Sequence, residues 1–238
     1  GVKRLFYYTT IFEVLGFAYY GPFDGHNVKE LAETLETAKL IHRPVLIHVR
    51  TYKGKGYQYA EQDPSIYHGL SGFDVTTGDT GEKSQSFSDV FGQTLCELAR
   101  ENEKLCAITA AMQNGTGLSR FREEFRDRFF DVGISEEHAV TFAGGLAAGG
   151  MLPVFAVYST FLQRAYDELI HDVSLQNTKV ILAIDRAGVV GEDGKTHQGV
   201  FDAAFLQTIP NVTVYSPATF QELRVQLAYL VEKGEGLC

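Results

Sequence analysis

The sequence predicts an α/β protein built on a parallel β-sheet. After residue 86, stretches with helical patterning alternate with short apolar runs. These runs are apolar at nearly every position, which is typical of strands that are covered on both faces. Ligands of such sheets bind beyond the carboxyl ends of the strands, so polar side chains directly after each apolar run are the first candidates for a site.

The elements expected in the first 50 residues each have a local signal. Their expected order is a helix over residues 4–15, a short strand over 17–20 that ends in a Gly-Pro turn, a helix over 28–40 and a strand over 45–50. The second helix is predicted from Asn27 and Glu30, which have the spacing of a capping box. The second strand is predicted from an apolar, β-branched run after Pro44.

Residues 51–85 predict a binding loop that leads into an interdomain linker. The stretch is rich in Gly, Ser, Thr, Asp and Lys and has neither helical nor strand periodicity. It contains a basic, glycine-rich sequence from Lys53 to Tyr57, which is too short for a P-loop, and a lone histidine, His68. A lone histidine is more often structural than catalytic. The expected domains are residues 1–80 and 81–238.

The larger domain has a regular pattern of helices and strands. Expected helices cover residues 88–101, 136–148, 161–176 and 219–232, and expected strands cover 105–109, 129–132, 154–158, 180–184 and 212–215. The uncharged run over 139–163 is long enough to span a bilayer. It contains four glycines and Pro153, so a helix, a tight turn and a buried strand are the better interpretation, and no membrane span is expected.

Charge and cysteine content exclude several classes of protein. The 21 Lys and Arg residues against 30 Asp and Glu residues give a net charge of -9, which argues against a general nucleic-acid binder but allows a local basic pocket for a phosphate. Cys96, Cys106 and Cys238 follow no metal or disulfide spacing, and no signal peptide opens the sequence, so a reducing, cytoplasmic compartment is expected. The chain starts without Met and stops where a strand should begin, as an excerpt of a longer protein would.

Polar clusters follow three of the expected strands. Glu136 opens a helix after the strand at 129–132, where an acidic residue either complements the helix dipole or points into a cleft. Phe161 and Arg164 follow the strand at 154–158, although a core aromatic and a solvated helix face are the plain alternatives. Asp185 and Arg186 follow the strand at 180–184, before a loop that is too long for a simple turn.

The long loop adds two more candidates, Asp193 and His197, and its plain alternative is a mobile surface loop. No Gly-x-Ser-x-Gly, zinc-binding or Rossmann motif is present in the sequence. The residues alone therefore predict an anionic-substrate cleft at the carboxyl edge of an α/β sheet. Its candidate residues are Glu136, Arg164, Arg186, Asp193 and His197.

Taken in order, these clusters resemble the thiamine-diphosphate enzymes, and most closely the 1-deoxy-D-xylulose-5-phosphate synthase family. The matching stretches cover essentially the whole chain, and the blocks at 158–166 and 185–198 are together highly specific. The stretches are Gly-Pro-Phe-Asp-Gly-His at 21–26, Lys-Gly-Lys-Gly-Tyr at 53–57, Asp-Val-Gly-Ile-Ser-Glu-Glu-His at 131–138, Tyr-Ser-Thr-Phe-Leu-Gln-Arg-Ala-Tyr at 158–166, Asp-Arg-Ala-Gly at 185–188 and Gly-Glu-Asp-Gly-Lys-Thr-His-Gln at 191–198.

The resemblance implies a fold and a role for each candidate residue. The chain would comprise the end of a diphosphate-binding domain followed by a pyrimidine-binding domain. Within the site, Glu136 would hydrogen-bond the aminopyrimidine of thiamine diphosphate, and Phe161 would stack on that ring. The other implied roles are acceptor-phosphate binding by Tyr158, Arg164 and Arg186, contacts to the acceptor's hydroxyl and carbonyl by Asp193 and His197, and contacts on the cofactor side by Lys53, Tyr57 and His68.

The implied reaction joins pyruvate to D-glyceraldehyde 3-phosphate with loss of CO2, as the first step of the non-mevalonate isoprenoid route, in a homodimer. The family binds Mg2+ through a Gly-Asp-Gly motif that is absent from this chain, and its N-terminal stretch and third domain are also missing. Ser-Glu-Glu at 135–137 replaces the commoner Ala-Glu-Gln. The alternatives are a transketolase, the β-subunit of a 2-oxo-acid dehydrogenase, and a truncated module that folds and pairs without turning over substrate.

Overall fold

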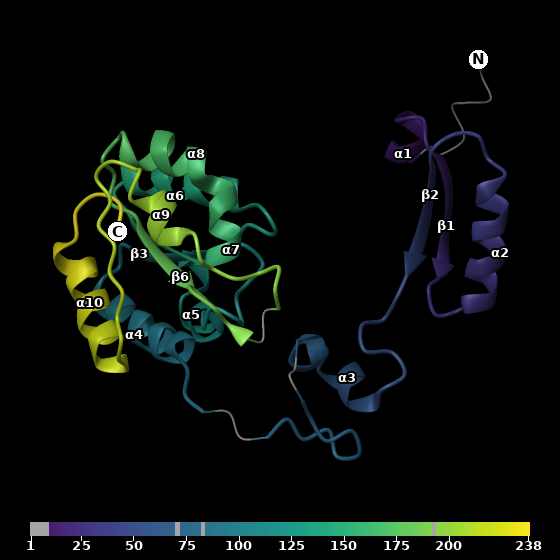
Figure 1. Ribbon diagram of the computed structural model, residues 1–238, viewed down its shortest axis with the longest axis horizontal. Coiled ribbons are helices and arrows are strands. Elements are labelled where there is room, and N and C mark those ends of the chain that lie inside the picture. The colour runs from purple at the N-terminus through teal and green to yellow at the C-terminus, as the bar shows by residue number, and fades with distance from the viewer. Residues whose placement is uncertain (1–9, 70–71, 82–83, 192–193) are drawn as a thin grey trace. The chain divides into compact units, whose positions relative to one another are not determined.

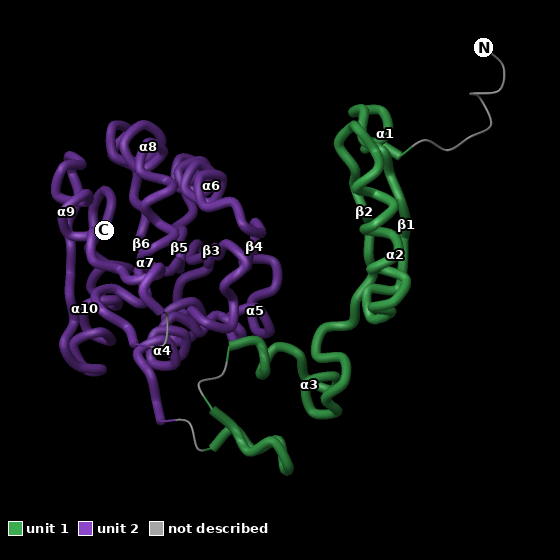
Figure 2. Tube along the Cα trace, turned by 45° about the vertical axis from the view of Figure 1, so that its right-hand side comes forward, with its two compact units in different colours: residues 1–82 green, residues 83–238 purple. Residues whose placement is uncertain are grey.

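The computed structural model describes residues 10–69, 72–81, 84–191 and 194–238 of the 238-residue chain. The chain divides into two compact units, residues 1–82 and residues 83–238 (Figure 2). Both units are α/β and both contain parallel strands, so the expected fold class is confirmed.

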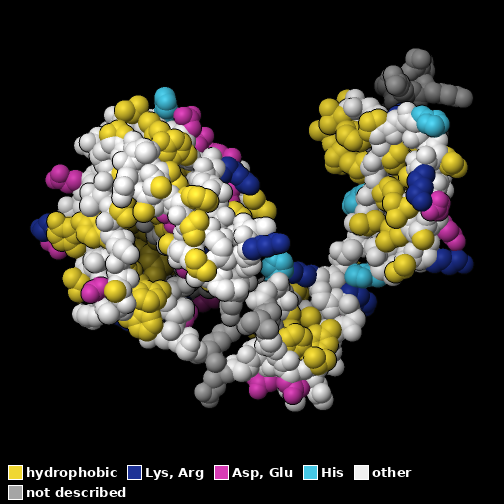
Figure 3. Space-filling view, viewed as in Figure 1, with side chains coloured by type: hydrophobic (Ala, Val, Ile, Leu, Met, Phe, Trp, Pro, Cys, Tyr) yellow, Lys and Arg dark blue, Asp and Glu magenta, His cyan; other side chains and the backbone are white. Residues whose placement is uncertain are grey.

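The first unit is a two-stranded parallel sheet with one connecting helix. Strand β1 (Ala18–Asp24) pairs with β2 (Val45–Arg50), and α2 (Val28–Lys39) joins them. The N-cap of this helix is as expected, since the Asn27 side chain accepts a hydrogen bond of 3.2 Å from the N–H of Glu30. The reciprocal bond of a capping box is not formed, because the N–H of Asn27 donates to the carbonyl of Asp24 at 3.1 Å. The short helix α1 (Ile11–Val14) precedes the sheet and exposes its apolar residues (Figure 3). Residues 4–9 of the expected first helix lie outside the described residues.

The expected Gly-Pro turn after residue 20 is wrong, because β1 continues through Gly21 and Pro22 to Asp24. The pairing with β2 shifts register between Tyr20 and Phe23 and then resumes. Proline has no N–H to donate to the ladder, so it interrupts the pairing locally without ending the strand.

The segment expected as a binding loop and linker contains local structure within residues 57–69 and 72–79. They contain α3 (Gln58–Gln62) and a 3-10 turn over Ile66–His68. The rings of Tyr57, Tyr59, Tyr67 and Phe73 pack together with centroids 5.2–5.7 Å apart. The three tyrosine hydroxyls donate to backbone carbonyls at 3.0, 3.4 and 2.5 Å, and the acceptors are those of Val75, Thr76 and Gly78. The packing of the rings and these hydrogen bonds, more than periodic secondary structure, stabilise the conformation of this segment.

The second unit is built on a four-stranded parallel sheet in the order β4-β3-β5-β6 (Figure 1). The strands are β3 (Leu105–Thr109), β4 (Phe129–Asp131), β5 (Leu152–Tyr158) and β6 (Ile181–Asp185). Four of the five expected strands are therefore confirmed. The fifth, at 212–215, is wrong: within the described residues, its ladder contact is the bridge between Val212 and Leu237. One isolated bridge at Val212 does not make residues 212–215 a strand.

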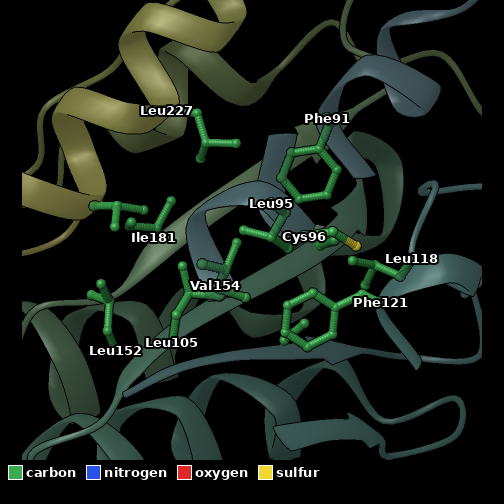
Figure 4. Close-up of a cluster of buried hydrophobic side chains, with 14 of the residues drawn as sticks. Phe91, Leu95, Cys96, Leu105, Leu118, Phe121, Leu152, Val154, Ile181 and Leu227 are labelled. Atoms are coloured by element: carbon green, nitrogen blue, oxygen red, sulfur yellow. The ribbon is translucent and has the colours of Figure 1, made fainter. Parts of the chain in front are cut away.

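Helices cover both faces of this sheet. One face packs against α4 (Phe87–Glu101), α5 (Ser119–Glu124) and α10 (Phe220–Lys233), and Figure 4 shows Leu95, Phe121 and Leu227 in one cluster with Val154. The other face packs against α6 (Glu136–Ala148), the helical stretch after β5, and α9 (Asp202–Leu206). Successive residues of β5 alternate between the two cores, so its apolar run is explained by burial on both sides.

The helix expected over 161–176 is divided into shorter turns. The structure has α7 (Ser159–Leu162), a 3-10 turn, α8 (Tyr166–Glu168) and a π-helical stretch over Leu169–Ser174. The uncharged run at 139–163 folds as α6, a turn and β5, as expected. In the part of the chain that the structure describes, no helix has the length and apolar character needed to cross a membrane.

Two glycines allow backbone segments of the second unit to touch. A Cβ at Gly92 in α4 would collide with the carbonyl of Gly117, and a Cβ at Gly117, which has a φ of +76°, would collide with the carbonyl of Ser88. The loop before α5 therefore lies directly on the backbone of α4. Gly145 in α6 offers a contrast, because a Cβ there would meet nothing within 4 Å.

We predict opposite effects for the same substitution at these two helical glycines. Gly92→Ala should lower the free energy of unfolding by about 1–3 kcal/mol, because the added methyl group forces α4 and the loop apart. Gly145→Ala should raise it by about 0.5–1 kcal/mol, because alanine is the better helix former and has room. Urea unfolding followed by circular dichroism measures both, and a stabilised Gly92→Ala would show that the backbones do not touch.

Candidate functional site

The carboxyl ends of the strands in the second unit meet at one edge of the sheet. Tyr158, the last residue of β5, pairs with Asp185, the last residue of β6, and Thr109 of β3 pairs with Asp131 of β4. Asp131 fixes the loops beyond this edge, because one of its carboxylate oxygens accepts from the N–H groups of Ala111 and Gly133 at 2.9 and 3.0 Å. Polar side chains that follow the strands are thus brought together.

A small open pocket of about 140 Å³ lies at this edge. Four of the expected site residues, Tyr158, Phe161, Arg186 and His197, line it together with Thr160. The Phe161 ring stacks against Tyr158 at 6.1 Å and meets the His197 ring edge-on at 5.6 Å. The pocket therefore combines an aromatic wall with one guanidinium and one imidazole.

Arg186 is held in a strained backbone conformation at the rim of this pocket. Its φ of +58° lies in the left-handed region, which residues other than glycine rarely adopt. Asp185 stabilises that conformation, since one of its oxygens accepts from the Arg186 N–H at 2.7 Å and the other accepts from the Ser88 hydroxyl at 2.6 Å. The guanidinium lies 4.6 Å from the centre of the Tyr158 ring, which is a cation–π geometry.

Glu136 is a buried carboxylate at the first turn of α6. Its side chain is 2% exposed, and Oε2 accepts a hydrogen bond of 2.9 Å from Nη1 of Arg164. A buried charge requires a partner, and here the partial positive charge of the helix N-terminus adds to the Arg164 guanidinium. The Arg164 side chain is about half exposed. The structure thus pairs Arg164 with Glu136, and its expected role in phosphate binding stays a prediction.

His197 and the long loop follow β6. His197 is exposed on one side, and its Nδ1 lies 2.8 Å from the Thr196 hydroxyl. Asp193 lies outside the described residues. At the end of the loop, Asp202 accepts a hydrogen bond of 2.6 Å from Ser159, and burial raises the pKa of the Asp202 carboxyl.

The three candidates in the first unit lie on one segment after β2. Lys53 lines an open pocket of about 380 Å³ together with Lys55 and Glu61. Tyr57 belongs to the aromatic cluster, where burial and the nearby Tyr67 raise the pKa of its hydroxyl. His68 is exposed at the end of the 3-10 turn. Within the unit, Lys53 is the candidate that lines the pocket.

Three groups build the site although sequence reasoning assigned none of them a role as a candidate residue. Thr160 lines the pocket, and Asp185 holds the backbone of Arg186. Gly115 lies under the Tyr158 hydroxyl so closely that a Cβ there would overlap it. Thr160 and Asp185 stand inside the strand-end clusters, so their position after apolar runs could have indicated them. Gly115 has no such signal, because only folding brings it to Tyr158.

The cysteines and acidic residues of the described part of the chain do not form a metal site. No group of three or more His, Cys, Asp or Glu side chains with suitable geometry occurs among the residues described. Cys96 and Cys106 are buried, and burial raises the pKa of both thiols to about 11. Both thiols are therefore protonated and unreactive at neutral pH.

We predict that the Glu136–Arg164 pair is energetically coupled. Arg164→Gln should lower the free energy of unfolding by about 1–2 kcal/mol, because it leaves a buried carboxylate without its cation. The double variant Glu136→Gln/Arg164→Gln should lose less than the sum of the two single variants, since two amides leave no charge unpaired. Urea unfolding of the four proteins measures the coupling, and strict additivity would mean that the pair contributes nothing.

Both units match family models. Residues 83–237 match the model for the transketolase pyrimidine-binding domain, and residues 1–51 match the model for 1-deoxy-D-xylulose-5-phosphate synthase. A 1-deoxy-D-xylulose-5-phosphate synthase of Symbiobacterium thermophilum is 60% identical over 227 residues, which is 95% of this chain and 35% of the relative. The synthase of Caldanaerobacter subterraneus subsp. tengcongensis is 58% identical over 223 residues, 93% of this chain and 36% of the relative.

Solved structures show the same fold. A split-gene transketolase, solved as an inactive β4 tetramer, has a TM-score of 0.57 and 28% identity, and the match covers 65% of this chain and 50% of that one. A transketolase from Campylobacter jejuni has a TM-score of 0.58 at 17% identity, over 98% of this chain and 48% of that one. The chain spans about a third of the length of the curated relatives it matches. With two thirds of its residues matched by the domain model, this chain belongs to the transketolase pyrimidine-binding domain family.

Proposed function

We propose that this chain is part of a 1-deoxy-D-xylulose-5-phosphate synthase, which joins pyruvate to D-glyceraldehyde 3-phosphate and releases CO2. The observation that carries the proposal is the 60% identity to a relative of that name over 95% of the chain. The match of residues 1–51 to the synthase family model supports this enzyme over a transketolase. The Asp-Arg-Ala-Gly and Tyr158–Tyr166 blocks, quoted above, argue against a dehydrogenase β-subunit as well.

The described residues fit the pyrimidine end of thiamine diphosphate. Glu136 offers a buried carboxylate that can accept a hydrogen bond from a ring nitrogen, and Phe161 offers an aromatic face at the rim of the pocket. When bound, the cofactor supplies the carbon centre at which pyruvate loses CO2. In the proposed site Glu136 holds a proton at the pyrimidine ring, Arg164 keeps that carboxylate oriented, and Phe161 excludes water from one face of the ring.

The phosphate of the acceptor fits the part of the pocket that Arg186 and Tyr158 line. Arg186 presents a guanidinium that can bind phosphate oxygens in a fork, and its stacking on Tyr158 limits the number of orientations it adopts. His197 lines the same pocket beside Phe161, where an imidazole can donate to the carbonyl or hydroxyl of a small aldehyde. In the same proposal, Arg164 also contacts the acceptor's phosphate, and Asp193 contacts the acceptor's hydroxyl or carbonyl.

The remaining parts of the proposal concern the whole protein. We assign residues 1–80 to the end of a diphosphate-binding domain, whose Lys53, Tyr57 and His68 serve the cofactor side. The described residues do not fit Mg2+, because they contain no group of carboxylates or histidines that could hold it. Mg2+ binding therefore falls to segments that the relatives have outside the matched region. A homodimer and a cytoplasmic location complete the proposal.

We predict that Glu136→Gln, made in the protein at the full length of its relatives, lowers kcat for pyruvate decarboxylation by about 10²–10⁴-fold. The amide keeps the shape of the side chain but can no longer hold a proton at the pyrimidine. The matched control is Glu137→Gln, which removes the neighbouring carboxylate of the same helical turn. Turnover of Glu136→Gln equal to that of the control would contradict the assignment.

We also predict that Arg186→Ala raises the KM for D-glyceraldehyde 3-phosphate by about 10–100-fold, because a charge-assisted phosphate contact is lost. The KM for pyruvate should change little. Arg186→Lys should raise the KM for D-glyceraldehyde 3-phosphate less than Arg186→Ala does, because lysine keeps the positive charge but lacks the planar fork of the guanidinium. Initial rates with each substrate varied in turn separate these effects. If both KM values rise together, Arg186 shapes the whole pocket and does not recognise the phosphate.

A further inference from the structure

Gln198 makes three hydrogen bonds across the long loop that follows β6. Its Oε1 accepts from the N–H of Val190 at 2.7 Å. Its Nε2 donates to the carbonyl of Val190 at 2.9 Å and to the carbonyl of Gly194 at 2.6 Å. A primary amide is needed to satisfy the N–H and the C=O of one residue at once, because it carries a donor and an acceptor side by side.

The amide of Gln198 continues a backbone pairing at the base of the same loop. Gly188 and Gly199 exchange hydrogen bonds, with the Gly188 N–H donating at 2.6 Å and the Gly199 N–H donating at 2.9 Å. Gly199 is buried, and a Cβ there would collide with the Ser159 hydroxyl and lie 2.6 Å from the carbonyl of Arg186. The base of the loop is therefore seated directly on the strand ends that form the pocket.

His197 lines the pocket and directly precedes Gln198, whose three hydrogen bonds to Val190 and Gly194 form a brace across the loop. Its backbone is bonded to that of Gln198, while its ring meets Phe161 at 5.6 Å and lines the pocket. The imidazole itself contacts the Phe161 ring at the pocket, and its Nδ1 lies 2.8 Å from the hydroxyl of Thr196, its neighbour in sequence. Whatever fixes the backbone at Gln198 therefore fixes the position from which the His197 ring reaches the pocket.

We propose that Gln198 is a positioning residue, which acts by holding His197 against Phe161. The proposal rests on the proposed function, in which His197 contacts the aldehyde acceptor. Gln198 touches neither substrate nor cofactor in this role. Its amide ties the backbone of Gln198 to Val190 and Gly194, so that His197 is in place before the acceptor binds.

The brace itself is tested by Gln198→Glu, which keeps the shape but exchanges two N–H donors for a carboxylate that faces two carbonyls. Gln207→Glu is the matched control, because it adds the same charge at an exposed residue of the same region. Hydrogen exchange at the amides of Gly188, Val190 and Gly199 should be about tenfold faster in Gln198→Glu than in the control. The NMR cross-peak between the His197 and Phe161 rings should weaken as well. Unchanged exchange and an unchanged cross-peak would overturn the proposal, whatever reaction the protein catalyses.

The link to catalysis is tested by a double-mutant cycle in the protein at the full length of its relatives. Gln198→Glu should raise the KM for D-glyceraldehyde 3-phosphate by about tenfold with His197 present, and by less than about twofold in a His197→Ala background. Equal effects in both backgrounds would overturn a role through His197. A wild-type protein that does not join pyruvate to the aldehyde would refute the proposed function, while the exchange experiment still decides the brace.

Discussion

Burial of the central sheet on both faces is the constraint from which the rest of the second unit follows. Every residue of β3 is buried, and β5 is buried from Leu152 to Val157. Strands in such a sheet have no face left for polar side chains, so chemistry is displaced to their ends. The register of β5 and β6 then decides which ends meet, and it places Tyr158 beside Asp185.

The loops around the candidate site are tied down by hydrogen bonds to carboxylate side chains. Asp185 holds Arg186 at a φ of +58°, Asp131 holds two loops, and Ser159 bonds Asp202. Strained backbone of this kind persists only where neighbouring groups compensate for it. The long loop is tied in the same way, by the Gly188–Gly199 pair and the Gln198 amide.

The two units show different ways of ordering a chain. The second unit has one apolar core on each face of its sheet. After β2 the first unit relies on ring packing and tyrosine hydroxyls, which need no periodic pattern in the sequence. For that reason residues 51–85 were expected to form a binding loop and linker, and the four aromatic side chains between Tyr57 and Phe73 were the signal that could have indicated local structure there.

The sequence by itself determined the fold class, four of the five strands of the larger unit and the segments that carry the site. Strands buried on both faces and helix caps can be recognised from the types of residues that stand close together in the sequence. From the residues alone it predicted a cleft of Glu136, Arg164, Arg186, Asp193 and His197, and two of these, Arg186 and His197, line one pocket. Tyr158 and Phe161, which also line it, were expected there from the family resemblance. The pairing of Arg164 with Glu136, the seat of Tyr158 on Gly115 and the brace from Gln198 were decided by tertiary structure. Each depends on where separate segments come to lie, and a short-range pattern holds no information about that placement.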